Sequence, residues 1–214
     1  MNKESIYWTF IVLIFIYFGY NYMKIDELAP GEVRIGEKIY ADKNLITHEF
    51  GNGDMIRIVG SDEEWMKCME TKEPACRIIG DKLGEGWRQQ GLLYNYWAIS
   101  DERSLAPEGW EVMSGEDWEN VYEHISDSGK DLERFAICSP SSVVIEGGRF
   151  MPMYEGEAAW WIEYSGLLTE KPTIVGIRET QDGLENDFKN VDFDYGFAIR
   201  CVKKEKTFFE KIGL

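Results

Sequence analysis

The sequence predicts an α+β domain of short, mainly antiparallel strands with two helices, preceded by one N-terminal transmembrane helix. Three observations lead to this fold class. A hydrophobic content of 44% with eight tryptophans is enough for a substantial core, and 21 glycines indicate many turns rather than long helices. An uncharged apolar run occupies residues 5–23. The 214 residues therefore provide one domain of ordinary size and one additional element.

Residues 5–23 carry no charged side chain and would rise about 28 Å as a helix, which nearly spans a bilayer. Tyrosines and a tryptophan cluster toward the ends of the run, as they do at membrane interfaces. A cleaved signal peptide needs small residues at its end, but Tyr20, Asn21 and Tyr22 stand there, and no cysteine is near for lipidation. We expect an uncleaved signal anchor at residues 1–24. A buried core helix is the weaker alternative because the run is apolar all round.

A linker at residues 25–32 contains the Pro30-Gly31 break, and the domain follows at residues 33–203. Alternating apolar residues at 33–40 predict a strand or hairpin, and the glycines of residues 50–54 predict a tight turn. Ser61 stands three residues before Glu64, which is a capping-box spacing. The first helix is therefore expected to begin at this serine.

Residues 91–118 combine a strand, a turn and a helix start. Residues 92–99 are rich in aromatic and branched side chains, and they predict one strand with large side chains on both faces. Pro107-Glu108-Gly109 predicts a turn. Ser114, three residues before Asp117, again has capping-box spacing, and apolar residues then recur at helical spacing. We expect the second helix here.

Four more strands are expected in the second half of the domain. Residues 174–178 are a short strand candidate. Residues 143–150 resemble a strand and Gly-Gly turn of the domain family whose motifs are given in the next paragraph, and residues 158–162 and 195–202 resemble two more of its strands, the last of which closes the domain. The tail at residues 204–214 lies outside this pattern. Its two phenylalanines either pack back onto the domain or belong to a frayed end.

The central motifs resemble the Fibrobacter succinogenes major paralogous (FISUMP) domain family. The resemblance rests on Tyr94-Asn95, Trp97-Ala98-Ile99, the Leu105–Val112 segment LAPEGWEV, and the helix start Glu116-Asp117-Trp118. Two departures are a swapped Tyr96-Trp97 order and Glu111 at a usual histidine. The resemblance extends over residues 33–203 and implies a C-type lectin-like fold, which is distantly similar to relatives of formylglycine-generating enzymes. Such a likeness implies a fold and not a function.

The same resemblance implies a disulfide. Four cysteines allow three complete pairings, which the sequence alone leaves open. Cys76 and Cys201 fall where family members often carry cysteine, so a Cys76–Cys201 bridge in an extracytoplasmic domain is expected. Closing so long a loop stabilises by about 4 kcal/mol in the chain-entropy model. The alternative is four buried free thiols in a reducing compartment.

No catalytic or metal-binding constellation is evident in the sequence. His48 and His124 are far apart and lack a metal-ligand spacing, and the cysteines do not reproduce the reactive pair of formylglycine-generating enzymes. Residues 182–194 hold several oxygen ligands of the kind that calcium accepts, but a solvated acidic loop is the favoured interpretation. We therefore expect no cofactor, no metal and no enzymatic activity.

The net charge of −16 disfavours nucleic acid and anionic lipid surfaces as partners, although the acidity also serves solubility. Trp160 and Trp161 are the candidate ligand-binding residues, because adjacent strand residues face opposite sides and one ring could stack on a sugar or on a partner protein. The alternative is that both rings are core.

The predicted function is a membrane-anchored, extracytoplasmic binding or interaction module of the cell envelope, periplasmic or on the cell surface. A structural component of a surface assembly stays open. An enzyme related to the formylglycine-generating group is disfavoured, because it requires a clustered reactive thiol or metal site.

Overall fold

The computed structural model describes residues 28–78, 91–128, 143–152, 157–162, 171–181 and 183–205. One compact unit runs from Pro30 to Lys203. No helix in these ranges is long and apolar enough to cross a membrane. The predicted anchor at residues 5–23 and most of the tail lie outside the described residues.

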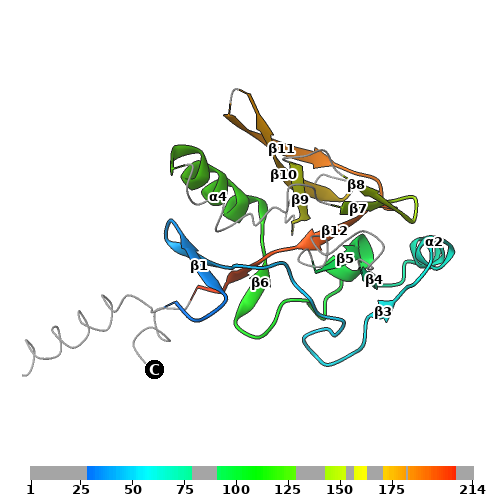
Figure 1. Ribbon diagram of the computed structural model, residues 1–214. Coiled ribbons are helices and arrows are strands. Elements are labelled where there is room, and N and C mark those ends of the chain that lie inside the picture. Colours follow the sequence, from blue (N-terminus) through cyan, green and yellow to red (C-terminus); the bar gives the residue numbers. More distant parts are fainter. Residues whose placement is uncertain are drawn as a thin grey trace, which may run out of the picture. The chain divides into compact units, whose positions relative to one another are not determined.

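The described strands form two sheets (Figure 1). The smaller sheet has the order β1 (Glu32–Ile35), β2 (Lys38–Ala41), β13 (Cys201–Lys203), β6 (Trp110–Val112). The larger sheet has the order β11 (Gly183–Asn190), β10 (Thr173–Thr180), β9 (Glu157–Trp161), β12 (Gly196–Ile199), β5 (Leu92–Asn95), β4 (Ala75–Ile78), β3 (Arg57–Ile58). A hairpin of β7 (Val143–Glu146) and β8 (Arg149–Pro152) joins it through β12. Only β12–β9 and β3–β4 are parallel pairs among the described strands.

Three helices accompany the sheets in the described part of the chain: α2 (Asp62–Thr71), α3 (Tyr96–Ile99) and α4 (Gly115–Ser128). Figure 1 shows α2 and α4 at opposite ends of the domain. The mixed α+β class with mainly antiparallel strands is therefore confirmed, with one short helix more than expected.

Both predicted helix starts are confirmed by their caps. The Ser61 hydroxyl accepts a hydrogen bond from Glu64 N at 3.2 Å, and Ser114 and Asp117 cap each other through Ser114 N to Asp117 Oδ2 at 2.8 Å and Asp117 N to Ser114 Oγ at 3.2 Å. The Gly147-Gly148 turn between β7 and β8 is also confirmed, with both glycines at positive φ.

The strand predicted at residues 92–99 is wrong in its second half. β5 ends at Asn95, and residues 96–99 form α3. The buried Asn95 side chain causes this change, because its Oδ1 accepts from Ala98 N at 2.9 Å as the helix cap and from Ala75 N at 3.0 Å. One asparagine thus ends the strand, starts the helix and fixes the neighbouring strand.

The closing strand predicted at residues 195–202 is divided in two. β12 belongs to the larger sheet and β13 to the smaller one, and Arg200 stands between them. Its side chain is only 2% exposed, and its carbonyl accepts from Met113 N at 2.9 Å rather than from a neighbour in either ladder. The two sheets are therefore connected through one buried arginine.

The core has two apolar clusters, and β9 contributes to both. Trp160 belongs to the cluster that contains Trp118, with ring centroids 5.6 Å apart. Trp161 belongs to the other, where its ring meets Phe197 edge-on at 4.9 Å. Adjacent strand residues face opposite sides, so one strand anchors both clusters.

Candidate functional site

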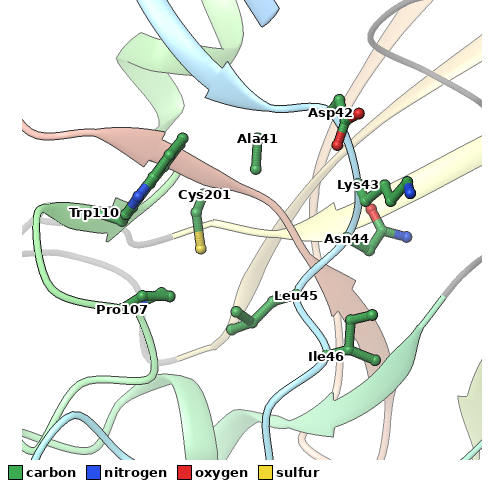
Figure 2. Close-up of a pocket in the computed structure, with 9 residues that line it drawn as sticks. All are labelled: Ala41, Asp42, Lys43, Asn44, Leu45, Ile46, Pro107, Trp110 and Cys201. Carbon is green, nitrogen blue, oxygen red and sulfur yellow. The ribbon is translucent and has the colours of Figure 1, made fainter. Parts of the chain in front are cut away.

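A pocket of about 240 Å³ lies between the segment that follows β2 and the turn that precedes β6 (Figure 2). Its lining residues are mainly apolar, and they are Ala41, Asp42, Lys43, Asn44, Leu45, Ile46, Pro107, Trp110 and Cys201. Figure 2 shows Leu45, Pro107, Trp110 and Cys201 gathered on the same side of the segment. Residues 41–46 form one wall of the pocket, and Pro107 and Trp110 form the other.

Arg200 holds the first wall in place. Its Nη1 donates to Ala41 O at 3.0 Å and its Nε to Asn44 Oδ1 at 3.2 Å. The same Asn44 oxygen accepts from the buried Trp160 Nε1 at 2.9 Å. Hydrogen bonds to charged donors are stronger than neutral ones, so Arg200 holds this wall together with two main-chain bonds, from Asp42 N to Gly31 O at 2.9 Å and from Leu45 N to Ile199 O at 2.8 Å.

Tyr94 fixes the chain just beyond this wall. Its hydroxyl accepts from Thr47 N at 2.9 Å and donates to Thr47 O at 2.7 Å. Burial raises the pKa of this phenol well above its ordinary range, which keeps the hydroxyl available as a donor. Gly91 is also close to the wall at a φ of +83°, and a side chain there would put its Cβ 3.1 Å from Leu45 O. The path of the wall therefore depends on glycine at position 91.

The second wall is a short turn that enters β6. Trp110 N donates to Pro107 O at 2.9 Å, and Trp110 then pairs with Lys203 in the β6–β13 ladder. The Lys203 ammonium lies 5.9 Å from the centre of the Trp110 ring and 2.6 Å from a Glu32 carboxylate oxygen. The Lys203 ammonium, whose charge Glu32 balances, therefore lies over one face of the Trp110 indole.

Cys201 lines the pocket as a protonated thiol. Burial raises its pKa to about 12. Burial has the same effect on Cys76, whose pKa is also raised to about 12. Reactive cysteines need the opposite shift, since the thiolate is the nucleophile. Neither thiol has the character of a catalytic nucleophile.

The predicted Cys76–Cys201 bridge is not formed in the structure, which has both residues as buried free cysteines. Cys76 pairs with Tyr94 in the larger sheet, whereas Cys201 pairs with Val112 in the smaller one. The two thiols thus belong to strands of different sheets, although both contribute to one apolar cluster. Cys138 lies outside the described residues.

Trp160 and Trp161 lie on opposite faces of β9, as expected, but neither ring is on an open face. Their exposed fractions are 3% and 1%, and the Trp161 indole donates to Tyr94 O at 2.7 Å. The expectation of an outward ring is corrected, because the α4 side covers Trp160 and the β12 side covers Trp161. Trp160 still contributes indirectly, since it holds the first wall of the pocket through Asn44.

The acidic segment predicted as a loop is strand β11 and the turn after it, and Asp182 lies outside the described residues. Its Asn186 accepts from Trp118 Nε1 at 2.7 Å, and Asp187 pairs with Lys189 at 2.5 Å. His48 and His124 are exposed, and His124 lies on α4 whereas His48 lies in the segment between β2 and β3. Within the described ranges, no three His, Cys, Asp or Glu side chains are grouped as a metal ion would require.

The family model of the Fibrobacter succinogenes major domain matches residues 33–143. The chain belongs to this family. The recognition based on the YN, WAI and LAPEGW motifs is thereby confirmed. No curated protein and no solved structure matches the chain.

The family match places both pocket walls inside the Fibrobacter succinogenes major domain, because residues 41–46 and 107–110 fall within it. The match ends before Trp160 and Arg200, which hold the first wall. Strands after residue 143 therefore complete a site whose walls come from the matched part.

The pocket was not predicted from the sequence. One signal for it was present: Arg200 interrupts an otherwise apolar closing segment, and a buried arginine needs acceptors from another part of the chain. The sequence did not indicate that those acceptors would be Ala41 and Asn44, 159 and 156 positions away.

Proposed function

We propose that this protein is a non-catalytic binding or interaction module of the cell envelope, and that the pocket between residues 41–46 and Pro107–Trp110 is its binding site. One observation carries the proposal. The pocket walls present apolar side chains to the outside, while buried polar contacts through Arg200, Trp160 and Tyr94 hold the backbone of one wall. A preformed apolar recess on a rigid framework is the usual basis of small binding sites.

The thiol chemistry supports binding over catalysis. A relative of the formylglycine-generating enzymes would need thiols with lowered pKa values, and those of Cys76 and Cys201 are raised by burial. Three described hydroxyls have clearly raised pKa values: those of Tyr40 and Tyr94 donate to backbone oxygens, and that of Tyr195 is hydrogen-bonded to Glu146. These groups stabilise the fold and are not available as acids or bases.

The cellular setting is a further part of the proposal. Residues 5–23 serve as an uncleaved membrane anchor, and the domain lies outside the cytoplasm with a C-type lectin-like fold. The uncharged run at residues 5–23 supports the membrane anchor, and the α+β architecture with mainly antiparallel strands supports the C-type lectin-like fold. N-terminal sequencing of the mature protein and carbonate washing of membranes test the anchor. A mature chain that starts near Met23 would contradict it.

Array binding tests the binding function. The full chain in detergent is applied to arrays of glycans and of peptides, with Ile46→Asp as the site variant. Ile46 lines the pocket and is 68% exposed, so the substitution leaves the core intact. Ile78→Asp is the matched control, because Ile78 is 55% exposed and does not line the pocket. Binding that both variants retain equally would contradict the proposed site.

A further inference from the structure

We infer that the pocket binds one apolar side chain of a polypeptide partner whose flanking residues are basic. This inference rests on the proposed binding function and specifies the class of partner. It follows from the size of the pocket, the direction of its polar groups and the charge around it.

The size of the pocket fits a single side chain. Its volume of about 240 Å³ is below the roughly 300–1,000 Å³ of sites that enclose drug-sized ligands. Leu45, Pro107 and Trp110 offer aliphatic and aromatic surface on opposite sides of this volume. Apolar contact is therefore what the walls provide.

Apart from the Asp42 carboxylate, the polar side chains of the lining are engaged or directed elsewhere. Asn44 Oδ1 accepts from Arg200 and Trp160, and the Cys201 thiol is protonated and a weak donor. Figure 2 shows the Lys43 ammonium pointing away from Leu45 and Trp110. Sugar recognition needs hydrogen-bonding groups directed at the ring hydroxyls beside the stacking surface. With one carboxylate beside mainly apolar walls, this lining suits an apolar side chain next to a basic residue better than a sugar.

The charge around the pocket favours a basic partner. Asp42 and Lys43 are the charged residues of the lining, and the Lys43 ammonium points away from Leu45 and Trp110 (Figure 2). Glu108 follows Pro107, and neither Asp42 nor Glu108 forms an ion pair within the described ranges. The whole chain has a net charge of −16. A second copy of the chain, nucleic acid and anionic lipid would each be repelled, whereas lysine or arginine beside the bound side chain would be attracted.

Fluorescence anisotropy of labelled peptides tests this inference with the full chain in detergent. The probe is a short acetylated peptide with one leucine between lysines. Replacing the leucine with alanine is expected to weaken binding at least about tenfold, because the leucine side chain buried in the pocket carries most of the affinity. Replacing the lysines with glutamates is expected to weaken binding at low salt, and the difference should shrink as salt is added.

Variants of the protein test whether the leucine of the peptide binds in the pocket. Ile46→Asp and Leu45→Ala are each expected to weaken binding of the leucine peptide at least about tenfold. Ile46 is exposed, so its variant should fold even if Leu45→Ala, whose side chain packs on the core, is less stable. Ile78→Asp, on β4 and outside the pocket, should bind as the unmodified chain does.

A second pair of variants tests the charge. Asp42→Asn combined with Glu108→Gln should reduce the preference for lysine-flanked over glutamate-flanked peptide. The matched control removes two exposed carboxylates from α4 by Glu116→Gln and Glu119→Gln, and it should change that preference less, because neither residue lines the pocket.

Three results would overturn the inference, and they are distinguishable. Equal binding of leucine and alanine peptides, or of lysine-flanked and glutamate-flanked peptides, removes the proposed partner class. Binding of a neutral oligosaccharide that Ile46→Asp abolishes leaves the proposed function standing and refutes only the polypeptide partner. If no probe binds in a way that depends on Ile46 and Leu45, the inference and the proposed function both fail.

Discussion

Arg200 donates a hydrogen bond from its Nε to Asn44 Oδ1 across 3.2 Å, although 156 positions separate the two residues. This contact joins the junction of β12 and β13 to the first wall of the pocket. Because Trp160 Nε1 donates to the same oxygen, one side chain links the wall to the larger sheet and to the core. The shape of the pocket therefore depends on Asn44.

Asn44→Ala is expected to lower the free energy of unfolding by about 1–3 kcal/mol, because it removes an acceptor that serves two buried donors. Chemical denaturation measures this change. The neighbouring Lys43→Ala is the control, since Lys43 is exposed, and it should stay within about 0.5 kcal/mol of the unmodified chain. Equal free energies of unfolding for the two variants would show that the hydrogen bonds to Asn44 do not stabilise the fold.

The sequence predicted those parts of the fold that are decided within a few residues. The caps at Ser61 and Ser114 depend on local spacing, and the Gly147-Gly148 turn depends on backbone freedom. The strand expected at residues 158–162 from the family resemblance is found one residue earlier, at Glu157–Trp161. Such local preferences are readable from one chain because the partners lie three or four positions apart.

The sequence did not reveal features that are decided by distant partners. Asn95 ends β5 because it caps α3 and also accepts from Ala75 N, and Arg200 divides the closing strand because it bonds Ala41 and Asn44. The run at residues 92–99 has the side chains of a strand, so tertiary contacts overrode its local preference. The pocket was missed for the same reason.

Asn95→Ala is expected to destabilise the domain by at least about 1–3 kcal/mol, because Ala75 N and Ala98 N lose a buried acceptor and Glu73 O loses a donor at 2.8 Å. The free energy of unfolding in denaturant measures the loss. Asn52→Ala is the matched control, since Asn52 is exposed and bonds only Asp54 among the described residues. A loss no larger than that of the control would contradict the assigned role of Asn95.

Trp160→Ala and Trp161→Ala are each expected to cost roughly 3–5 kcal/mol, because both rings are core. Thermal and chemical unfolding measure the cost. Met151→Ala provides an exposed comparison at 42% exposure and should change stability far less. A normal melting transition for either tryptophan variant would show that its ring is not packed as described.

The two buried thiols predict a loss of stability at alkaline pH. Their pKa values in the folded chain are about 12, above the ordinary value near 9, so the protonated thiols stabilise fully below about pH 9. This contribution is lost as the pH rises toward 12, at up to about 1.4 kcal/mol per pH unit for each thiol.

Denaturation at stepped pH measures that slope. Replacing Cys76 and Cys201 with alanine should make it shallower between about pH 9 and 12. Peptide mapping without reductant is the companion measurement. A Cys76–Cys201 bridge in the purified protein, or an unchanged slope in the alanine variants, would contradict the free-thiol structure.

The most direct test of the pocket is the indole N–H resonance of Trp110 in a ¹⁵N-labelled full chain titrated with the lysine-flanked leucine peptide. Trp110→Phe assigns this signal. The account predicts that the Trp110 signal shifts with increasing peptide, while those of Trp118 and Trp160, which donate to Asn186 and Asn44 inside the fold, stay in place. Bound peptide with an unchanged Trp110 signal would contradict the site.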